Sequence, residues 1–317
     1  MIRKVILFVI CAVLLGISIT ATAQTVVRKG AGATLPYPLI RKLFQSYEST
    51  HSDTQIIFEA IGSGSGTLKF NADKVDFLIT DVPYTADKST ASLETLFIIP
   101  ISLSGVAVAY NLPENPELNL NREILKRIYT GSITKWNHEA IQALNPDSNL
   151  PDLKIKTARR PFESGTQRIM SDFLDYPITD PKTIVISNTG MASFIDTTPG
   201  ALGFLSFSAA TNQYLKIARI ENSAGQFIHP NPHVISLGKQ PRTDDSDDAE
   251  SPYAYPIVGF SWLVFDRDDD PMRDLARWIL QTGQSYHKQF HYAPLPEALR
   301  QSMVDALSDS TDSRSPR

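Results

Sequence analysis

Residues 158–166 combine the residue types that bind an anion. They read ARRPFESGT, and they follow an apolar-alternating run that predicts a strand. An apolar stripe after them predicts a helix with Ser164 at its N-cap. A helix start presents unpaired N–H groups and a partial positive charge, and Arg160 adds a cation with a planar fork of donors. This chemistry suits a tetrahedral oxyanion, although an ordinary capped helix beside a surface arginine would give the same pattern.

Two further turns rich in glycine and hydroxyl residues also lead into predicted helices. Segment 30–38 reads GAGATLPYP, and segment 61–67 reads IGSGSGT and follows a predicted strand at 55–60. Asp81 comes directly after another predicted strand, at 77–80. Open α/β sheets bind ligands at the carboxyl ends of their strands, so these segments are candidates for one common site.

Predicted strands and helices alternate along the whole chain, which indicates an α/β fold. The length of 317 residues is sufficient for two domains. Further strands are expected at 105–110, 201–207 and 255–265, and helices at 122–129, 138–144, 271–281 and 296–307. The polar residues 308–317 are expected to form a disordered tail.

The amino-terminal segment has the pattern of an export signal. Arg3 and Lys4 precede an apolar run at 5–19, and an Ala-x-Ala cleavage pattern ends at Ala23. The apolar run is short for a helix that spans a bilayer. We therefore expect residues 1–23 to be a signal peptide that is cleaved after Ala23.

Composition and charge restrict the classes of function. Apolar residues make up 42% of the chain and charged residues 20%, as in ordinary globular proteins. The net charge is -4 and becomes -6 once Arg3 and Lys4 are removed, so nothing suggests a nucleic-acid partner. The only cysteine, Cys11, lies in the signal segment, and the mature protein therefore has no disulfide and no thiol chemistry.

A serine hydrolase is the main catalytic alternative. Ser63 and Ser65 lie in a strand-to-helix turn, but the residue between them is Gly64, so the Gly-x-Ser-x-Gly order is off by one. No histidine lies in a loop expected at the site, and neither glycine-rich turn has the order of a phosphate loop or a dinucleotide fingerprint. We therefore predict a protein without catalytic residues.

Two features are candidates for a metal site. His287 and His291 are four residues apart, but no third ligand is evident, so two exposed histidines are the better interpretation. Residues 243–250 form an acidic loop without the spacing or the glycine of an EF-hand, which favours a solvated loop. We predict no metal and no cofactor.

Several motifs occur in a fixed order along the chain. They are GAGAT at 30–34, GS at 62–63, DF with TDVP within 76–83, IYTG with KW within 128–136, Arg160 with SGT at 164–166, and PGALG at 199–203. This ordered set closely resembles the phosphate-binding proteins of bacterial ABC phosphate importers, the PstS family, over residues 30–307. The resemblance implies the two-lobe periplasmic-binding-protein fold, with two interdomain crossovers and the ligand in the cleft. Lobe one would comprise residues 24–100 and 256–317, and lobe two residues 101–255.

The resemblance also implies which groups hold phosphate. Hydroxyls, backbone N–H groups and one cation would contact the anion from both lobes, and a carboxylate would accept its proton. The implied residues are Thr34, Leu35, Ser63, Asp81, Arg160, Ser164, Gly165 and Thr166.

Asp81 has the most specific of these implied roles. Hydrogen phosphate keeps a proton that a buried carboxylate can accept, whereas sulfate at neutral pH has none and would face the carboxylate with bare oxygens. The structural alternative is an aspartate that caps a turn at the end of a strand.

The chain departs from the family pattern at three positions, and Leu35 in place of an aromatic has no consequence if only its N–H is used. Family members commonly carry an aspartate two positions after the arginine, where it tethers the guanidinium, and this chain has Phe162 there. Arg160 is then either held by another group or carries a charge that is less offset. Glu163 stands where a glycine is common, so its carboxylate must point away from the anion.

The implied partners are inorganic phosphate and the membrane subunits of an ABC permease. We expect a monomer in the periplasm, or secreted, that binds no nucleic acid. An extracellular scavenger of phosphate or another oxyanion, an adhesion protein outside transport, and the less favoured serine-type hydrolase remain as alternatives.

Overall fold

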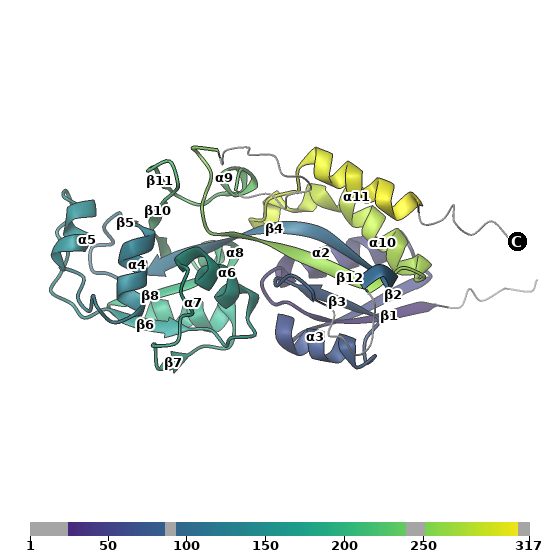
Figure 1. Ribbon diagram of the computed structural model, residues 1–317, viewed down its shortest axis with the longest axis horizontal. Coiled ribbons are helices and arrows are strands. Elements are labelled where there is room, and N and C mark those ends of the chain that lie inside the picture. Colours follow the sequence, from purple (N-terminus) through teal and green to yellow (C-terminus); the bar gives the residue numbers. More distant parts are fainter. Residues whose placement is uncertain (1–24, 86–92, 239–250, 310–317) are drawn as a thin grey trace, which may run out of the picture.

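Two lobes lie side by side along the long axis of the molecule, and strand β4 (Leu96–Tyr110) runs from one into the other (Figure 1). The computed structural model describes residues 25–85, 93–238 and 251–309. The predicted signal peptide, the acidic loop 243–250 and the tail residues 310–317 lie outside these ranges, and the expectations for them stay predictions. Within the described ranges, no helix combines the length and the apolar character needed to cross a membrane.

Lobe one is built from both ends of the chain. Its elements are β1 (Val26–Gly32), α2 (Tyr37–Glu48), β2 (Thr54–Ala60), α3 (Ser63–Asn71), β3 (Phe77–Thr80), η1 (Leu93–Thr95), β12 (Val258–Asp266), α10 (Asp270–Gln281), η2 (Gly283–Tyr286), η3 (Lys288–Phe290) and α11 (Glu297–Asp309). Helices α2, α10 and α11 lie on one side of its strands, and α3 lies on the other (Figure 1).

Lobe two is built from the middle of the chain. Its elements are β5 (Asn119–Leu120), α4 (Arg122–Tyr129), α5 (Glu139–Leu144), β6 (Lys156–Arg159), α6 (Gly165–Leu174), β7 (Thr183–Ile184), α7 (Asn188–Thr197), β8 (Ala201–Ser206), α8 (Phe207–Asn212), β9 (Lys216–Ile217), β10 (Arg219–Glu221), β11 (Phe227–Ile228) and α9 (Pro232–Ser236). The short strands β11, β10 and β5 form a separate sheet in that order.

One mixed sheet passes through both lobes. Its strand order is β2-β1-β3-β12-β4-β8-β6-β7, and β9 pairs with β4. Strand β4 pairs with antiparallel β12 up to Gly105 and with antiparallel β8 from Val106 onward. Strand β1 is parallel to β2 and β3, and β6 is parallel to β8, so each lobe collects the carboxyl ends of several strands at one edge. This arrangement confirms the predicted α/β fold.

The helices form where the apolar spacing places one face against the core. Helix α6 begins directly after Ser164, whose Oγ accepts the N–H of Gln167 at 3.4 Å, so the predicted N-cap is confirmed. Helix α4 has the predicted bounds, and segment 255–265 contains the single strand β12. Helix α2 packs an apolar stripe against the strands, formed by Leu39, Ile40, Leu43, Phe44 and Tyr47.

Several details differ from the expectation. Helix α11 extends to Asp309, so residues 308 and 309 are helical and do not belong to the predicted tail, and β4 begins at Leu96 rather than at residue 105. The strand expected at 201–207 ends one residue earlier, because Ser206 caps α8 and its Oγ accepts the N–H of Ala209 at 3.2 Å. The expectation of two exposed histidines is wrong for His287, which is fully buried with Nε2 3.0 Å from the carbonyl oxygen of Ile101. Among the described residues, no group of three histidine, cysteine or acidic side chains could hold a metal ion.

Glycine at position 66 allows α3 to pack directly on β1. A Cβ at Gly66 would lie 2.4 Å from Cα and 2.8 Å from N of Gly32, which are backbone atoms that cannot yield. We expect Gly66→Ala to lower the free energy of unfolding by about 1–3 kcal/mol, measured by urea denaturation, because it overpacks this contact. Ser65→Ala, on the exposed side of the same helix, should change it by less than about 0.5 kcal/mol. Equal stability of Gly66→Ala and wild type would contradict this packing.

Candidate anion-binding site

The carboxyl ends of β1, β2 and β3 bring the predicted site segments of lobe one together. Gly32, the last residue of β1, is paired with Ala60 of β2 and Ile79 of β3. The N–H of Gly62 donates to the carbonyl oxygen of Gly32 at 2.8 Å, which joins the start of α3 to the end of β1. The residues that follow these strand ends are Thr34, Leu35, Ser63 and Asp81.

Asp81 is buried and is held from two sides. Its N–H donates to Ser63 Oγ at 3.1 Å, and Ser261 Oγ donates to Asp81 Oδ1 at 2.6 Å. Ser261 lies on β12, the strand that separates β3 from β4 in the sheet. Because Ser63 Oγ accepts from Asp81, its own hydroxyl hydrogen can point toward a ligand.

The start of α6 in lobe two meets Asp81 across the lobes. A Cβ at Gly165 would lie 2.2 Å from Cβ and 2.6 Å from Oδ2 of Asp81, so only glycine permits this approach. Ser164 and Thr166 on either side of it are also buried. The N–H groups at the start of α6 would donate to the oxygens of a small anion bound at this point, because a helix start favours negative charge.

Arg160 is buried beside this helix start and is held by neutral groups. Its NH1 donates to Asn188 Oδ1 at 3.0 Å, and its NH2 donates to the carbonyl oxygen of Ile186 at 2.7 Å. Asn188 Oδ1 also accepts the N–H of Ser206 at 3.0 Å, at the end of β8, which fixes the amide. Arg160 Nε is buried and has no hydrogen-bond partner among the residues that the structure describes.

Phe162 takes no part in holding Arg160. It is 56% exposed, and its ring lies 4.7 Å from the guanidinium carbon of the neighbouring Arg159. Of the two alternatives that the sequence left open, other groups do hold Arg160. Because those groups are neutral, no carboxylate in this hydrogen-bond network offsets the charge of Arg160.

Burial and opposite charge act against each other at Asp81 and Arg160. Burial raises the pKa of Asp81 to about 7, although the Ser261 hydrogen bond and the Arg160 charge oppose the rise. Burial lowers the pKa of Arg160 to about 10, and Asp81 opposes that change. Arg160 is therefore cationic at neutral pH, while Asp81 can hold or release a proton. One fixed cation and one titrating carboxyl suit an anion that carries a proton itself.

The raised pKa of Asp81 predicts how stability depends on pH without ligand. The folded protein holds the Asp81 proton up to about pH 7, whereas the unfolded chain releases it near pH 4, so this contribution is complete below pH 4 and is lost as the pH rises through 7. At pH 8 we expect Asp81→Asn to be more stable than wild type in urea denaturation by roughly 2–4 kcal/mol, and near pH 4 to be about equal. A stability difference that is the same at both pH values would contradict the shift.

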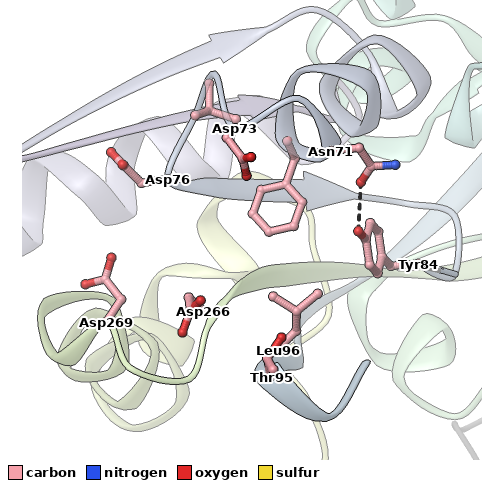
Figure 2. A pocket seen from close by; sticks show the side chains of 10 residues that line it. Asn71, Asp73, Asp76, Tyr84, Thr95, Leu96, Asp266 and Asp269 are labelled. Atoms are coloured by element: carbon pink, nitrogen blue, oxygen red, sulfur yellow. Dashed lines mark hydrogen bonds between the residues drawn. The ribbon is translucent and has the colours of Figure 1, made fainter. Parts of the chain in front are cut away.

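A separate cavity of about 430 Å³ lies elsewhere in lobe one and does not suit an anion (Figure 2). Four aspartates line it, namely Asp73, Asp76, Asp266 and Asp269. Asp269 forms a 2.7 Å ion pair with Arg28, and Asp76 Oδ2 accepts the N–H of Lys29 at 2.7 Å. Asp76 and Asp269 therefore connect β1 to neighbouring parts of lobe one.

The turns of the site could be predicted from the sequence, but the residues that support them could not. Ser261 and Asn188 hold the two charged side chains, and Tyr292 donates from its hydroxyl to the carbonyl oxygen of Leu35 at 2.7 Å. None of these three belongs to a local motif that marks a ligand site, and no sequence signal pointed to them.

Comparison with known proteins relates the chain to a family of binding proteins. The family model described as a PBP superfamily domain matches residues 20–282. The phosphate-binding protein PstS of Pasteurella multocida is 27% identical over 314 residues, covering 90% of each chain. The phosphate-binding protein PstS3 of Mycobacterium bovis BCG is 31% identical over 320 residues, covering 88% of this chain and 85% of the relative.

Solved structures show the same two-lobe fold. A putative phosphate ABC transporter substrate-binding protein with bound phosphate from Clostridium perfringens has a TM-score of 0.66 and 17% identity, covering 86% of this chain and 100% of that chain. The high-affinity periplasmic phosphate-binding protein PfluDING, bound with phosphate, has a TM-score of 0.68 and 18% identity, covering 88% of this chain and 93% of that chain. By the family model and the sequence relatives together, this chain belongs to the PstS family of phosphate-binding proteins within the PBP superfamily.

Proposed function

We propose that this chain binds inorganic phosphate between its lobes and delivers it to an ABC phosphate permease. The observation that carries the proposal is the meeting of buried Arg160 and the α6 start from lobe two with buried Asp81 from lobe one. The relatives are named for phosphate binding, and two of the similar structures contain phosphate.

The eight predicted residues supply the interactions that this function needs. Thr34, Ser63, Ser164 and Thr166 would donate hydroxyls, and Leu35, Ser63, Gly165 and Thr166 would donate backbone N–H groups. Arg160 supplies the cation, and Asp81 accepts the proton of hydrogen phosphate. Charge-assisted hydrogen bonds contribute about 1.5–3 kcal/mol each, so several of them exceed the roughly 8 kcal/mol of micromolar binding even after desolvation. No metal ion is required.

The protein acts outside the cytoplasm as the exported binding component of an importer. Export would use the signal peptide 1–23, with cleavage after Ala23, and the mature protein would be a periplasmic or secreted monomer that binds no nucleic acid. We propose lobe boundaries at residues 24–100 with 256–317 and at 101–255. The change of partner strand within β4 and the start of β12 at Val258 support crossovers near these points.

The protein is a binding protein rather than an enzyme. The relatives do not favour the scavenger, the adhesion protein or the hydrolase. Ser63 Oγ accepts an N–H from Asp81, and no described histidine makes a hydrogen bond to it. Phosphatase and esterase assays are therefore expected to show no turnover.

Calorimetric titration of protein stripped of ligand by unfolding and refolding tests the proposal. We expect phosphate to bind with a dissociation constant on the order of 1 µM or below, equivalent to at least about 8 kcal/mol. Sulfate should bind far more weakly under the same conditions. A protein that refolds correctly and shows no heat of phosphate binding would overturn the proposed function, and equal binding of both anions would reassign the protein to a general oxyanion binder.

A further inference from the structure

Gly64 and Glu163 touch across the two lobes, directly beside the anion site. Gly64 is the second residue of α3 in lobe one, and Glu163 precedes the N-cap of α6 in lobe two. The N–H of Gly64 donates to the carbonyl oxygen of Glu163 at 3.2 Å. Neither residue belongs to the set proposed to contact phosphate, although each is the neighbour of a residue that does.

The two residues fit together because one lacks a side chain. A Cβ at Gly64 would lie 2.4 Å from Cβ, 2.8 Å from Cγ and 3.3 Å from Cα of Glu163. The Cβ and Cα of Glu163 follow its backbone, so they cannot swing away as the end of a flexible side chain can. The aliphatic part of Glu163 thus covers Gly64 while the residue as a whole stays exposed to solvent.

The same two residues lie at the mouth between the lobes. A cavity of about 260 Å³ there is lined from lobe one by Ser63, Gly64 and Thr67, and from lobe two by Phe162, Glu163 and Arg168. The Gly64–Glu163 contact forms part of the lining of this cavity, next to Ser63. A change in how closely the two residues approach must therefore change how closely the helix starts of α3 and α6 approach the anion.

We propose that the Gly64–Glu163 contact sets how far the lobes close and thereby determines phosphate affinity, without either residue contacting the anion. The inference rests on the proposed function and extends it to two residues with a positioning role. A ligand that contacts both lobes stabilises the closed arrangement. The contacts between the lobes limit how closely they can approach each other. The missing Cβ at Gly64 and the side chain at Glu163 are complementary, so they should act as a pair.

The test is a double-mutant cycle read by phosphate titration of the full mature chain. We expect Gly64→Ala to raise the dissociation constant of phosphate by roughly 5- to 150-fold, because the new Cβ overpacks the contact and holds the lobes apart. Glu163→Gly alone should change it by less than about threefold, because the hydrogen bond from the Gly64 N–H to the carbonyl oxygen of residue 163 remains. The double variant Gly64→Ala/Glu163→Gly should recover to within about threefold of Glu163→Gly, because the space for the new Cβ is restored.

Matched variants separate this role from general damage. Gly64→Ala/Glu163→Ala keeps the Cβ of residue 163 and should stay as weak as Gly64→Ala. Ser65→Ala, the next residue on the exposed side of α3, should bind phosphate as wild type does. The melting temperature of Gly64→Ala without phosphate should lie within about 2–4 °C of wild type, because the lobes can separate when no ligand holds them together.

Each outcome decides between the proposals. If wild type binds phosphate and Gly64→Ala binds it equally well, the contact has no role in affinity, while the proposed function stands. A weak Gly64→Ala variant that Glu163→Gly does not rescue also overturns the contact as the cause. If wild type itself does not bind phosphate, the proposed function fails first.

Discussion

Arg160→Ala is expected to abolish phosphate binding at micromolar concentrations. Arg160 is buried at the site and is the cation proposed to contact the ligand, and its removal would leave both the anion and Asp81 without a positive partner. Truncating one partner of a buried, hydrogen-bonded charge pair costs about 2–5 kcal/mol, which raises a dissociation constant roughly 30- to 5000-fold. Calorimetric titration of refolded protein measures the change.

Arg159→Ala provides the matched control, since it removes the same charge one residue away. The Arg159 guanidinium lies over the Phe162 ring, and its NH1 donates to the carbonyl oxygen of Arg160 at 3.3 Å. Arg159 is therefore not among the groups proposed to donate to phosphate. We expect less than about a fivefold change for this variant, as for a charge outside the site. Comparable losses in both variants would show that long-range charge, rather than the buried guanidinium, attracts phosphate.

Asp81→Asn is expected to remove most of the discrimination between phosphate and sulfate. In wild type at pH 8, the ionised carboxylate accepts the proton of hydrogen phosphate but repels the bare oxygens of sulfate, and sites of this kind discriminate by about 10⁴–10⁵. The asparagine amide can donate to a bare oxygen instead, so the ratio of the two dissociation constants should fall by about 100-fold or more. Competition titrations with both anions at pH 8 give this ratio.

The pKa of Asp81, about 7, adds a dependence on pH to this prediction. Below pH 7 the free protein carries a protonated Asp81, which can donate to a sulfate oxygen, so wild type should discriminate less at pH 5.5 than at pH 8. Asp81→Asn has no such proton, so its ratio should change less between the two pH values than the wild-type ratio does. A wild-type ratio that does not change with pH, or an Asn variant that still rejects sulfate, would contradict the role of the carboxylate.

The parts of the site that depend on local chemistry could be predicted from the sequence. The start of α6 is marked by Ser164 before an apolar stripe, and Ser164 does cap that helix. The position of Asp81 follows from the sequence because a mainly apolar four-residue strand ends just before it, and β3 has these bounds. The ordered motifs then pointed to the family, which the sequence relatives confirm.

The supporting residues could not be predicted, because their positions depend on the order of strands in the sheet. Ser261 reaches Asp81 only because β12 returns from the carboxyl-terminal part of the chain and inserts between β3 and β4. Asn188 reaches Arg160 because the start of α7 lies beside the end of β8. For Glu163 the sequence indicated only where its carboxylate must not point, and its contact with Gly64 depends on how the lobes face each other.

A crystal structure of the protein with phosphate tests the central claim most directly. We predict one tetrahedral density between the lobes, with oxygens about 2.7–3.2 Å from the Arg160 guanidinium and from the N–H groups at the start of α6, and with Asp81 Oδ2 in contact with the protonated oxygen. Phosphate bound with full occupancy anywhere else, with Arg160 and Asp81 free of it, would contradict the account.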